Sequence, residues 1–400
     1  MKRNLLFIAL AAAAMTMASC SKDATEYAEN PEVPAVQTLD AAYIRANGTS
    51  TEIDLPEGGN YALETDADWL TVSASTRAGA AKAVLSASVN EAFESRRATV
   101  RVMDAQSGAE LYVLPVVQSV SNVLPGALVF QEIFYTSNAL ASTGKPATAH
   151  GDQYFMITNN SDDDVDISGL MIMEAKINST TENIEYTDDI RSSYTPVQTV
   201  YCIPADNGKI LGPGEYIIVA NNAQDHTPDS FDLTAADYEW FDESTVSSMT
   251  DIDNKEVPNL DIWFTYTKSL WILHDRGFLG YAIAMPPAGM TKEQFLATYK
   301  WEGTYINHTP KGDYTMKITN AYKVPNDWVV DAVNLSVPGS FYTPSFGATV
   351  DAGWTYCGSM DQDPDRYGKC VQRKYADDGM TLVDTNNSTN DFIPNATPSL

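Results

Sequence analysis

The sequence predicts an all-β protein made of two tandem β-sandwiches, on three observations. Of its 400 residues, 44% are hydrophobic and only 20% charged, which is too apolar for a disordered acidic chain. The 23 Gly and 20 Pro residues separate short runs rich in Val, Thr and Tyr, a pattern typical of strands and turns. Long Ala-, Leu-, Glu- and Lys-rich segments are scarce, and the length suits two or three domains.

Residues 1–19 are predicted to be a lipoprotein signal peptide. A positive start precedes an apolar run, Leu5 to Ala18, that is too short to span a bilayer. The run ends at Cys20 in the order Met-Ala-Ser-Cys, which resembles the lipobox of bacterial lipoproteins. Cys20 is then the lipidated N-terminus, anchored in the outer membrane on its periplasmic or its outer face. The alternative is ordinary cleavage beside an incidental cysteine.

Residues 20–34 are acidic, contain prolines and have little apolar content, so they predict a flexible tether. Acidic residues close behind a lipidated cysteine also resemble the surface-export signals of Bacteroidetes lipoproteins.

Residues 35–121 predict the first sandwich. Short alternating runs follow one another, separated by turn signals, at Thr51–Leu55, Tyr61–Thr65, Leu70–Ser73, Ala83–Val89, Ala98–Met103 and Leu111–Val117. This spacing favours an antiparallel sandwich of short strands.

Four landmarks of this segment resemble the BACON domain, an immunoglobulin-like module of Bacteroidetes surface and secreted proteins. In chain order they lie at Trp69, Asn90, the run 96–100, and Gln118. The resemblance implies carbohydrate binding. The residues themselves favour structural roles: Trp69 in the core or at its rim, Asn90 in a turn and Gln118 at a strand end. We interpret the module chiefly as a spacer.

Residues 126–400 predict the second sandwich, with strands expected at Ala127–Tyr135, Gln153–Thr158, Val165–Ile167, Glu215–Ala220, Ser269–Leu273, Phe278–Met285 and Trp328–Leu335. The turns at Phe155–Ser161, Asp166–Gly169 and Pro213–Gly214 resemble the lamin-tail domain, another immunoglobulin-like sandwich. The last residues, Tyr367–Lys374 and Asp384–Phe392, resemble an uncharacterised family of Bacteroidetes lipoproteins, which implies no activity.

A long insertion is expected at about 225–325, with two short helices. Thr234 followed by Asp237 predicts a helix near 235–241, and Thr291 followed by Gln294 is a better capping box for a helix near 292–300.

The chain shows no motif for catalysis, a cofactor or a metal. Its formal charge of −28 makes nucleic-acid binding improbable. The four histidines lie far apart, and no metalloprotease, serine-hydrolase or nucleotide-binding motif occurs. The Asp361–Asp365 run has calcium-loop spacing, but Arg366 and Gln372 replace the required Gly and Glu, so a solvated acidic loop is the better interpretation.

Three cysteines remain after lipidation, in an oxidising compartment. We favour a Cys357–Cys370 disulfide, with Cys202 as a spare thiol.

Aromatic residues are densest in the insertion. Trp240, Trp263 and Trp301 are the candidate ligand-binding residues, with mini-cores under long loops as the alternative interpretation. The sequence therefore predicts a non-catalytic accessory binding lipoprotein that takes a glycan or nutrient ligand or docks on an outer-membrane transporter. The alternatives are an adhesin or structural protein-binding lipoprotein, and a hydrolase with its site in the 225–325 insertion.

Overall fold

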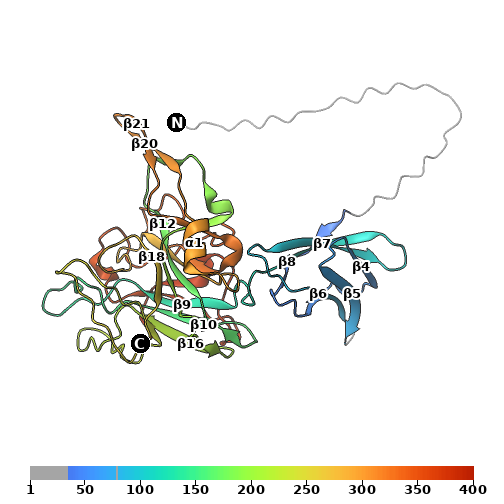
Figure 1. Ribbon diagram of the computed structural model, residues 1–400, viewed down its shortest axis with the longest axis horizontal. Coiled ribbons are helices and arrows are strands. Elements are labelled where there is room, and N and C mark those ends of the chain that lie inside the picture. Colours follow the sequence, from blue (N-terminus) through green and yellow to red (C-terminus); the bar gives the residue numbers. More distant parts are fainter. Residues whose placement is uncertain (1–34, 78–79) are drawn as a thin grey trace, which may run out of the picture.

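The computed structural model describes residues 35–77 and 80–400. The predicted signal peptide, Cys20 and the tether lie outside the described residues. Strands dominate, and the fold is the predicted all-β sandwich type (Figure 1). No helix within the described ranges has the length and hydrophobicity needed to cross a membrane.

The N-terminal region, residues 35–118, contains two sheets packed on one core. One sheet comprises β1 (Gln37–Thr38), β2 (Ala42–Ile44), β4 (Tyr61–Thr65), β7 (Arg96–Asp104) and β8 (Glu110–Gln118). The other comprises β3 (Thr51–Asp54), β5 (Leu70–Arg77) and β6 (Ala80–Ala87). Their inward residues, such as Ile44, Leu85 and Val100, have no exposed surface because alternate positions of each strand face the core.

The C-terminal region, residues 126–400, contains two six-stranded sheets. The first has the order β17 (Tyr238–Glu239), β16 (Tyr216–Ala220), β10 (Tyr154–Asn159), β9 (Leu128–Phe134), β24 (Cys370–Arg373) and β25 (Phe392–Ala396). The second has the order β18 (Asp261–Thr265), β14 (Tyr194–Cys202), β12 (Met171–Asn178), β19 (Leu279–Ala284) and β23 (Val329–Val333), with β22 (Tyr322–Pro325) also paired to β14.

The second sheet is buried on both faces. Ile172 of β12 joins the large core that also contains residues of the first sheet, whereas its neighbours Met171 and Met173 join a second core. Helix α1 (Lys292–Thr298) contributes Phe295 to that second core. Strands with two covered faces are apolar at nearly every position, as β19 is.

Several smaller elements surround the two six-stranded sheets, which together form the body of the C-terminal region. They are β11 (Val165–Asp166) paired with β15 (Ile210–Leu211), the short helices η1 (Ile190–Ser192), η2 (Asn326–Trp328), η3 (Pro364–Arg366) and α2 (Ser388–Asp391), and a three-stranded sheet of β13 (Ile184–Tyr186), β20 (Thr304–Thr309) and β21 (Gly312–Lys317). The last sheet stands away from the body, and we call it the arm (Figure 1).

One of the two helix predictions is confirmed. Helix α1 begins after Thr291, whose hydroxyl accepts a hydrogen bond from the Gln294 amide, while the Gln294 side chain accepts one from the Thr291 amide. The helix predicted near 235–241 is wrong. Thr234 donates its hydroxyl to Asp232 and does not act as a cap, and Tyr238–Glu239 instead pair with β16.

The strand predicted at Ser269–Leu273 is also wrong. Its backbone amides bond to side chains and not to a neighbouring strand: Trp271 donates to Asp242 and Leu273 to Gln153. A hydrophobic run held by buried polar side chains looks like a strand in sequence but forms no ladder.

The segment that joins the two regions is fixed at both ends. Val120 packs in the second core of the C-terminal region and Val123 in the large core. The Ala46 amide donates to the Ser121 carbonyl at 3.0 Å, and the Gly126 amide donates to the Val330 carbonyl at 2.8 Å. The two regions therefore meet along a defined surface.

Candidate functional site: a cleft between the two regions

A cleft of about 590 Å³ lies where the two regions meet. This volume is in the range of small-ligand sites. Both regions contribute to its lining, and we call this space the inter-region cleft. The N-terminal region contributes Tyr43, Phe93, Glu94 and Arg97, and the C-terminal region contributes Tyr194, Tyr299, Asp327, Trp328 and Asp331.

Asn90 shapes the N-terminal wall. Its side-chain amide donates to the carbonyls of Glu94 and Ser119 at 3.0 and 3.2 Å, and its side-chain oxygen accepts from the Ala92 amide. These bonds hold the loop that presents Phe93, whose side chain is 38% exposed. The turn role predicted for Asn90 is confirmed.

Gln118 fixes the same wall from behind. Its side-chain amide donates to the carbonyls of Arg45, Ala46 and Ser88 at 2.8 to 3.2 Å. On the adjacent strand β2, Tyr43 is 41% exposed and lines the cleft. Buried amides thus position two solvent-facing aromatic rings.

The C-terminal wall is more deeply packed. Tyr299 ends helix α1, and its ring meets the Trp328 ring edge-on with centroids 4.9 Å apart. Asn326 anchors η2, because its side chain accepts from the Thr195 hydroxyl at 2.9 Å and donates to the Arg191 carbonyl at 3.0 Å. Packed aromatic rings and side-chain hydrogen bonds thus form this wall.

One ion pair spans the cleft. Arg97 of β7 donates to both carboxylate oxygens of Asp327, at 2.6 and 2.8 Å. The opposite walls also interact at Tyr299: burial raises the pKa of its hydroxyl, and Tyr194 and Glu94 raise it further. Since Glu94 belongs to the N-terminal wall, groups from both regions converge here.

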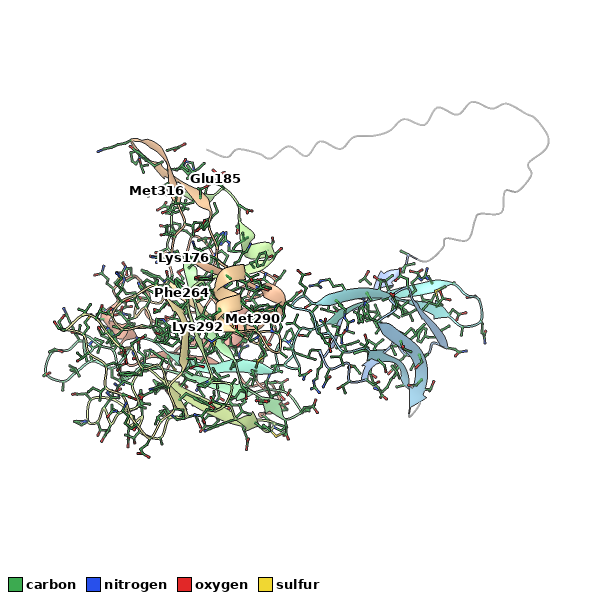
Figure 2. The ribbon with its side chains drawn as sticks, in the orientation of Figure 1. Lys176, Glu185, Phe264, Met290, Lys292 and Met316 are labelled. Carbon is green, nitrogen blue, oxygen red and sulfur yellow. The ribbon has the colours of Figure 1, made fainter. Side chains whose placement is uncertain are left out.

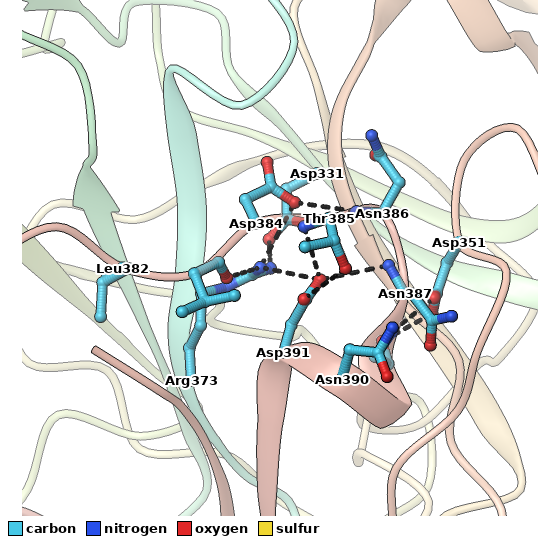
Figure 3. A network of polar contacts seen from close by, with 12 residues as sticks. Asp331, Asp351, Arg373, Leu382, Asp384, Thr385, Asn386, Asn387, Asn390 and Asp391 are labelled. Carbon is cyan, nitrogen blue, oxygen red and sulfur yellow. Dashed lines mark hydrogen bonds and ion pairs between the residues drawn. The ribbon is translucent and has the colours of Figure 1, made fainter. Parts of the chain in front are cut away.

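Asp331 lies at the floor, inside a buried polar network (Figure 3). It accepts from Arg373 at 2.6 Å and from the Phe130 amide at 2.7 Å. Burial raises the pKa of Asp331 to about 7, and Arg373 acts in the opposite direction. Asp384 and Asp391 are the other carboxylates near this guanidinium. The floor is therefore a structural ion-pair network.

The lining of the cleft offers several kinds of contact for a ligand. Among the described residues that line the cleft there is neither His nor Cys. Asp327 forms an ion pair with Arg97, and Asp331 forms one with Arg373. What remains accessible is a set of aromatic faces beside hydroxyl, amide and carboxylate groups, a combination that takes amphipathic ligands.

The three predicted tryptophans do not form a joint site. Trp240 is fully buried in the large core and donates from Nε1 to the Trp271 carbonyl at 2.9 Å. Trp301 is 4% exposed, in a small core at the base of the arm. Trp263 is half-buried and packs on Phe295. The ligand-contact prediction is therefore wrong for both buried residues: Trp240 belongs to the large core, and the mini-core alternative describes Trp301.

The predicted disulfide is not formed. Cys202, Cys357 and Cys370, the cysteines among the described residues, are buried free thiols. Cys357 belongs to the large core and Cys370 to a different cluster beyond the first sheet, because Val371, not Cys370, faces the large core. Burial raises the pKa of Cys357 to about 12, so its thiol is unreactive.

The acidic loop near Asp361 uses its carboxylates within the chain. Asp361 pairs with Arg276 at 2.6 Å, and Asp363 accepts from Ser359 and from the Asp365 amide. No cluster of three or more His, Cys, Asp or Glu residues suited to a metal ion occurs in the part of the chain that the structure describes.

Two family models match separate parts of the chain. Residues 212–399 match the model of a protein family of unknown function, DUF4876, and residues 36–120 match the viral BACON domain. A DUF4876 family protein from Bacteroides thetaiotaomicron has a similar crystal structure, with a TM-score of 0.53 and 17% identity over 91% of this chain and 96% of that one. At this identity the likeness shows the fold alone.

A crystal structure of protocadherin gamma B7 extracellular cadherin domains 1–4 gives a TM-score of only 0.18, with 9% identity over 73% of this chain and 75% of that one. A likeness this weak supports no statement about the fold or the function of this chain. The comparison with curated proteins finds no match. The BACON resemblance is thus confirmed for the N-terminal region, whereas the lamin-tail and lipoprotein resemblances stay predictions.

Sequence reasoning missed the cleft aromatics. Phe93 was the available signal, because it is one apolar ring in the otherwise polar turn Asn-Glu-Ala-Phe-Glu-Ser-Arg. Tyr43 and Tyr194 carry no such signal, since each sits in a run that reads as an ordinary strand.

Proposed function

We propose that the protein is a non-catalytic binding protein of the outer membrane, anchored by a lipid on Cys20, that holds a neutral glycan in the inter-region cleft. The observation that supports this most is the pair of exposed rings, Tyr43 and Phe93, that line a cleft of small-ligand size. Sugar rings have apolar faces bordered by hydroxyls, so they stack on aromatic rings and bond to polar groups around them.

Charge favours a neutral ligand over an anionic one. Arg97 is already paired with Asp327, and Glu94 lies beside it in the lining. The chain as a whole carries a formal charge of −28. An acidic polysaccharide would be repelled. In this proposal the anchored protein is an accessory module that presents its ligand to a neighbouring outer-membrane transporter.

The experiment is an array of neutral and acidic oligosaccharides probed with residues 21–400, followed by titration calorimetry on the best ligand. Phe93→Ala and Tyr43→Ala are expected to lower affinity at least about tenfold, as loss of an aromatic anchor does. Tyr216→Ala is the matched control, because Tyr216 is 50% exposed on β16, outside the cleft lining. Equal binding by all three variants would contradict the cleft assignment.

The anchor is tested separately. Cys20→Ala is expected to move the protein from the membrane fraction to the soluble fraction with unchanged circular dichroism, because only the lipid is lost. A variant that stays in the membrane pellet would contradict the lipid anchor.

A further inference from the structure

The arm has an exposed apolar side that the cleft does not explain. Figures 1 and 2 show it projecting from the body, with Met316 and Glu185 well separated from the labelled residues of the body below. All six residues of its edge strand β21 are exposed. Such an edge normally invites another strand.

Strand register divides the arm into two faces. Met316 lies opposite Tyr305, and Tyr314 lies opposite Asn307, so these four side chains share one face. Tyr305 packs on the small core at the base of the arm. Tyr314 and Met316 remain 50% and 43% exposed. Tyr314 and Met316 therefore leave a partly exposed apolar strip on this face of the edge strand.

The hydrogen-bond pattern identifies which backbone groups form the outer edge. The Ile318 amide donates to the Gly303 carbonyl at 2.9 Å, so every second residue back from Ile318, namely Met316 and Tyr314, also faces β20. Asp313, Thr315 and Lys317 therefore direct their N–H and C=O groups away from it. Among the described strands, β20 alone pairs with β21.

This edge is complementary to itself. If two copies of β21 pair in antiparallel fashion about Thr315, Asp313 of each faces Lys317 of the other, and Tyr314 faces Met316. The three opposed pairs at 313, 315 and 317 are all of the hydrogen-bonded kind, because their backbone groups point outward in both copies. Opposite charges and apolar pairs placed directly across a sheet are stabilising.

We propose that the arm is a homodimerisation surface, and that its partner is a second copy of this chain added edge to edge through β21. The result is a continuous sheet of six strands with a two-fold axis at Thr315, which is a closed, self-limiting contact. The inference is independent of ligand binding in the cleft.

Repulsion between the two negatively charged bodies determines how the dimer depends on salt concentration. Each copy carries a formal charge of −28, but the arm holds the bodies apart, and charges beyond about 8 Å are screened at physiological salt. The dimer is therefore expected to strengthen from low salt to about 0.15 M.

Sedimentation equilibrium of residues 21–400 tests the proposal. The wild-type chain is expected to fit a monomer–dimer equilibrium, and Thr315→Pro is expected to weaken the dimer at least about tenfold. Proline is tolerated on a free edge, and the Thr315 amide it removes is not bonded to β20, so the arm itself stays intact.

A charge exchange provides a second test. Lys317→Asp places two carboxylates opposite one another and is expected to weaken the dimer, whereas the double variant Asp313→Lys with Lys317→Asp restores the pairing. Because Asp313 also forms a hydrogen bond with His308, the fold of each variant is checked by circular dichroism. Lys268→Asp on the body is the control with the same change of charge, and it is expected to dimerise like the wild type.

Three results would overturn the proposal. One is a wild-type chain that stays monomeric up to about 1 mM. Another is a dimer that neither Thr315→Pro nor Lys317→Asp weakens, which would show that the copies meet elsewhere. The third is an arm that captures a different protein while the chain itself remains monomeric.

Discussion

In the N-terminal region neutral side-chain amides hold the loops in place, whereas the C-terminal region uses buried carboxylates in addition to amides such as that of Gln153. Asn90 and Gln118 donate to backbone carbonyls and carry no charge. Asp331 and Asp351 instead accept hydrogen bonds from backbone amides of distant segments, at Phe130 and Asn334. A carboxylate can bind several N–H groups at once, which suits a region with many long insertions.

The difference has an energetic consequence. A neutral amide buried with its bonds made costs little to desolvate, but a carboxylate must be paired or must accept strong hydrogen bonds. We therefore expect the C-terminal region to be the more sensitive one to loss of a single charged partner and to pH. Three experiments test this contrast, beginning with the largest expected effect.

Removal of Arg373 is expected to destabilise the C-terminal region by about 3–5 kcal/mol. Its guanidinium is buried against Asp331, Asp384 and Asp391, and Arg373→Met leaves these carboxylates without a cation (Figure 3). Calorimetry measures the shift of the melting transition. The control is Arg101→Ala in the N-terminal region, whose exposed contact with Glu64 at 3.4 Å is expected to contribute less than about 1 kcal/mol. Equal losses of stability for the two variants would show that the two regions do not differ in their sensitivity to the loss of a charged partner.

The second experiment concerns pH. Burial raises the pKa of Glu174 to about 7 and that of Asp242 to about 6. Unfolded carboxyls titrate near pH 4, so between about pH 4.5 and 7 the native state holds protons that the unfolded state has lost. The free energy of unfolding is therefore expected to fall as pH rises through this window.

Glu174→Gln tests this expectation directly. The amide keeps the size of the side chain and an acceptor for Gln198 or Trp271, whose bonds to Glu174 are 2.9 and 3.1 Å long. Relative to the wild type, the variant is expected to gain about 3 kcal/mol between pH 4.5 and 7, measured by urea unfolding at several pH values. A constant difference across the window would show that Glu174 is not protonated in the native state.

The same contrast explains what the sequence could predict. Strands such as β7 and helix α1 follow from local signals, namely alternation and a capping box. The strand at Ser269–Leu273 was mispredicted because its amides bond to Asp242 and Gln153, which are remote in sequence. Long-range side-chain contacts of this kind leave no local pattern.

The cleft could not be predicted from the sequence for a related reason. It exists because Val120 and Val123 of the connecting segment are buried in two cores of the C-terminal region, which fixes the regions against one another. Two valines in a short linker are a weak signal. Aromatic density, by contrast, is a strong signal that does not distinguish a surface from a mini-core, and Trp240 and Trp301 proved to be core residues.

The smallest expected effect is that of Asn90→Ala in the N-terminal region. The substitution removes the bonds to the Glu94 and Ser119 carbonyls and leaves these acceptors to find water, which is expected to cost about 1–2 kcal/mol. Because no charge is involved, the loss is expected to be the same at pH 4.5 and pH 7, unlike that of Glu174. Asn47→Ala is the control, since Asn47 is exposed and caps only its own turn at Thr49. If Asn90→Ala shows a loss of stability that grows across the pH window, amide and carboxylate contacts do not differ in their pH dependence. If it weakens glycan binding while the fold is kept, the loop that carries Phe93 is held for the ligand as well as for stability.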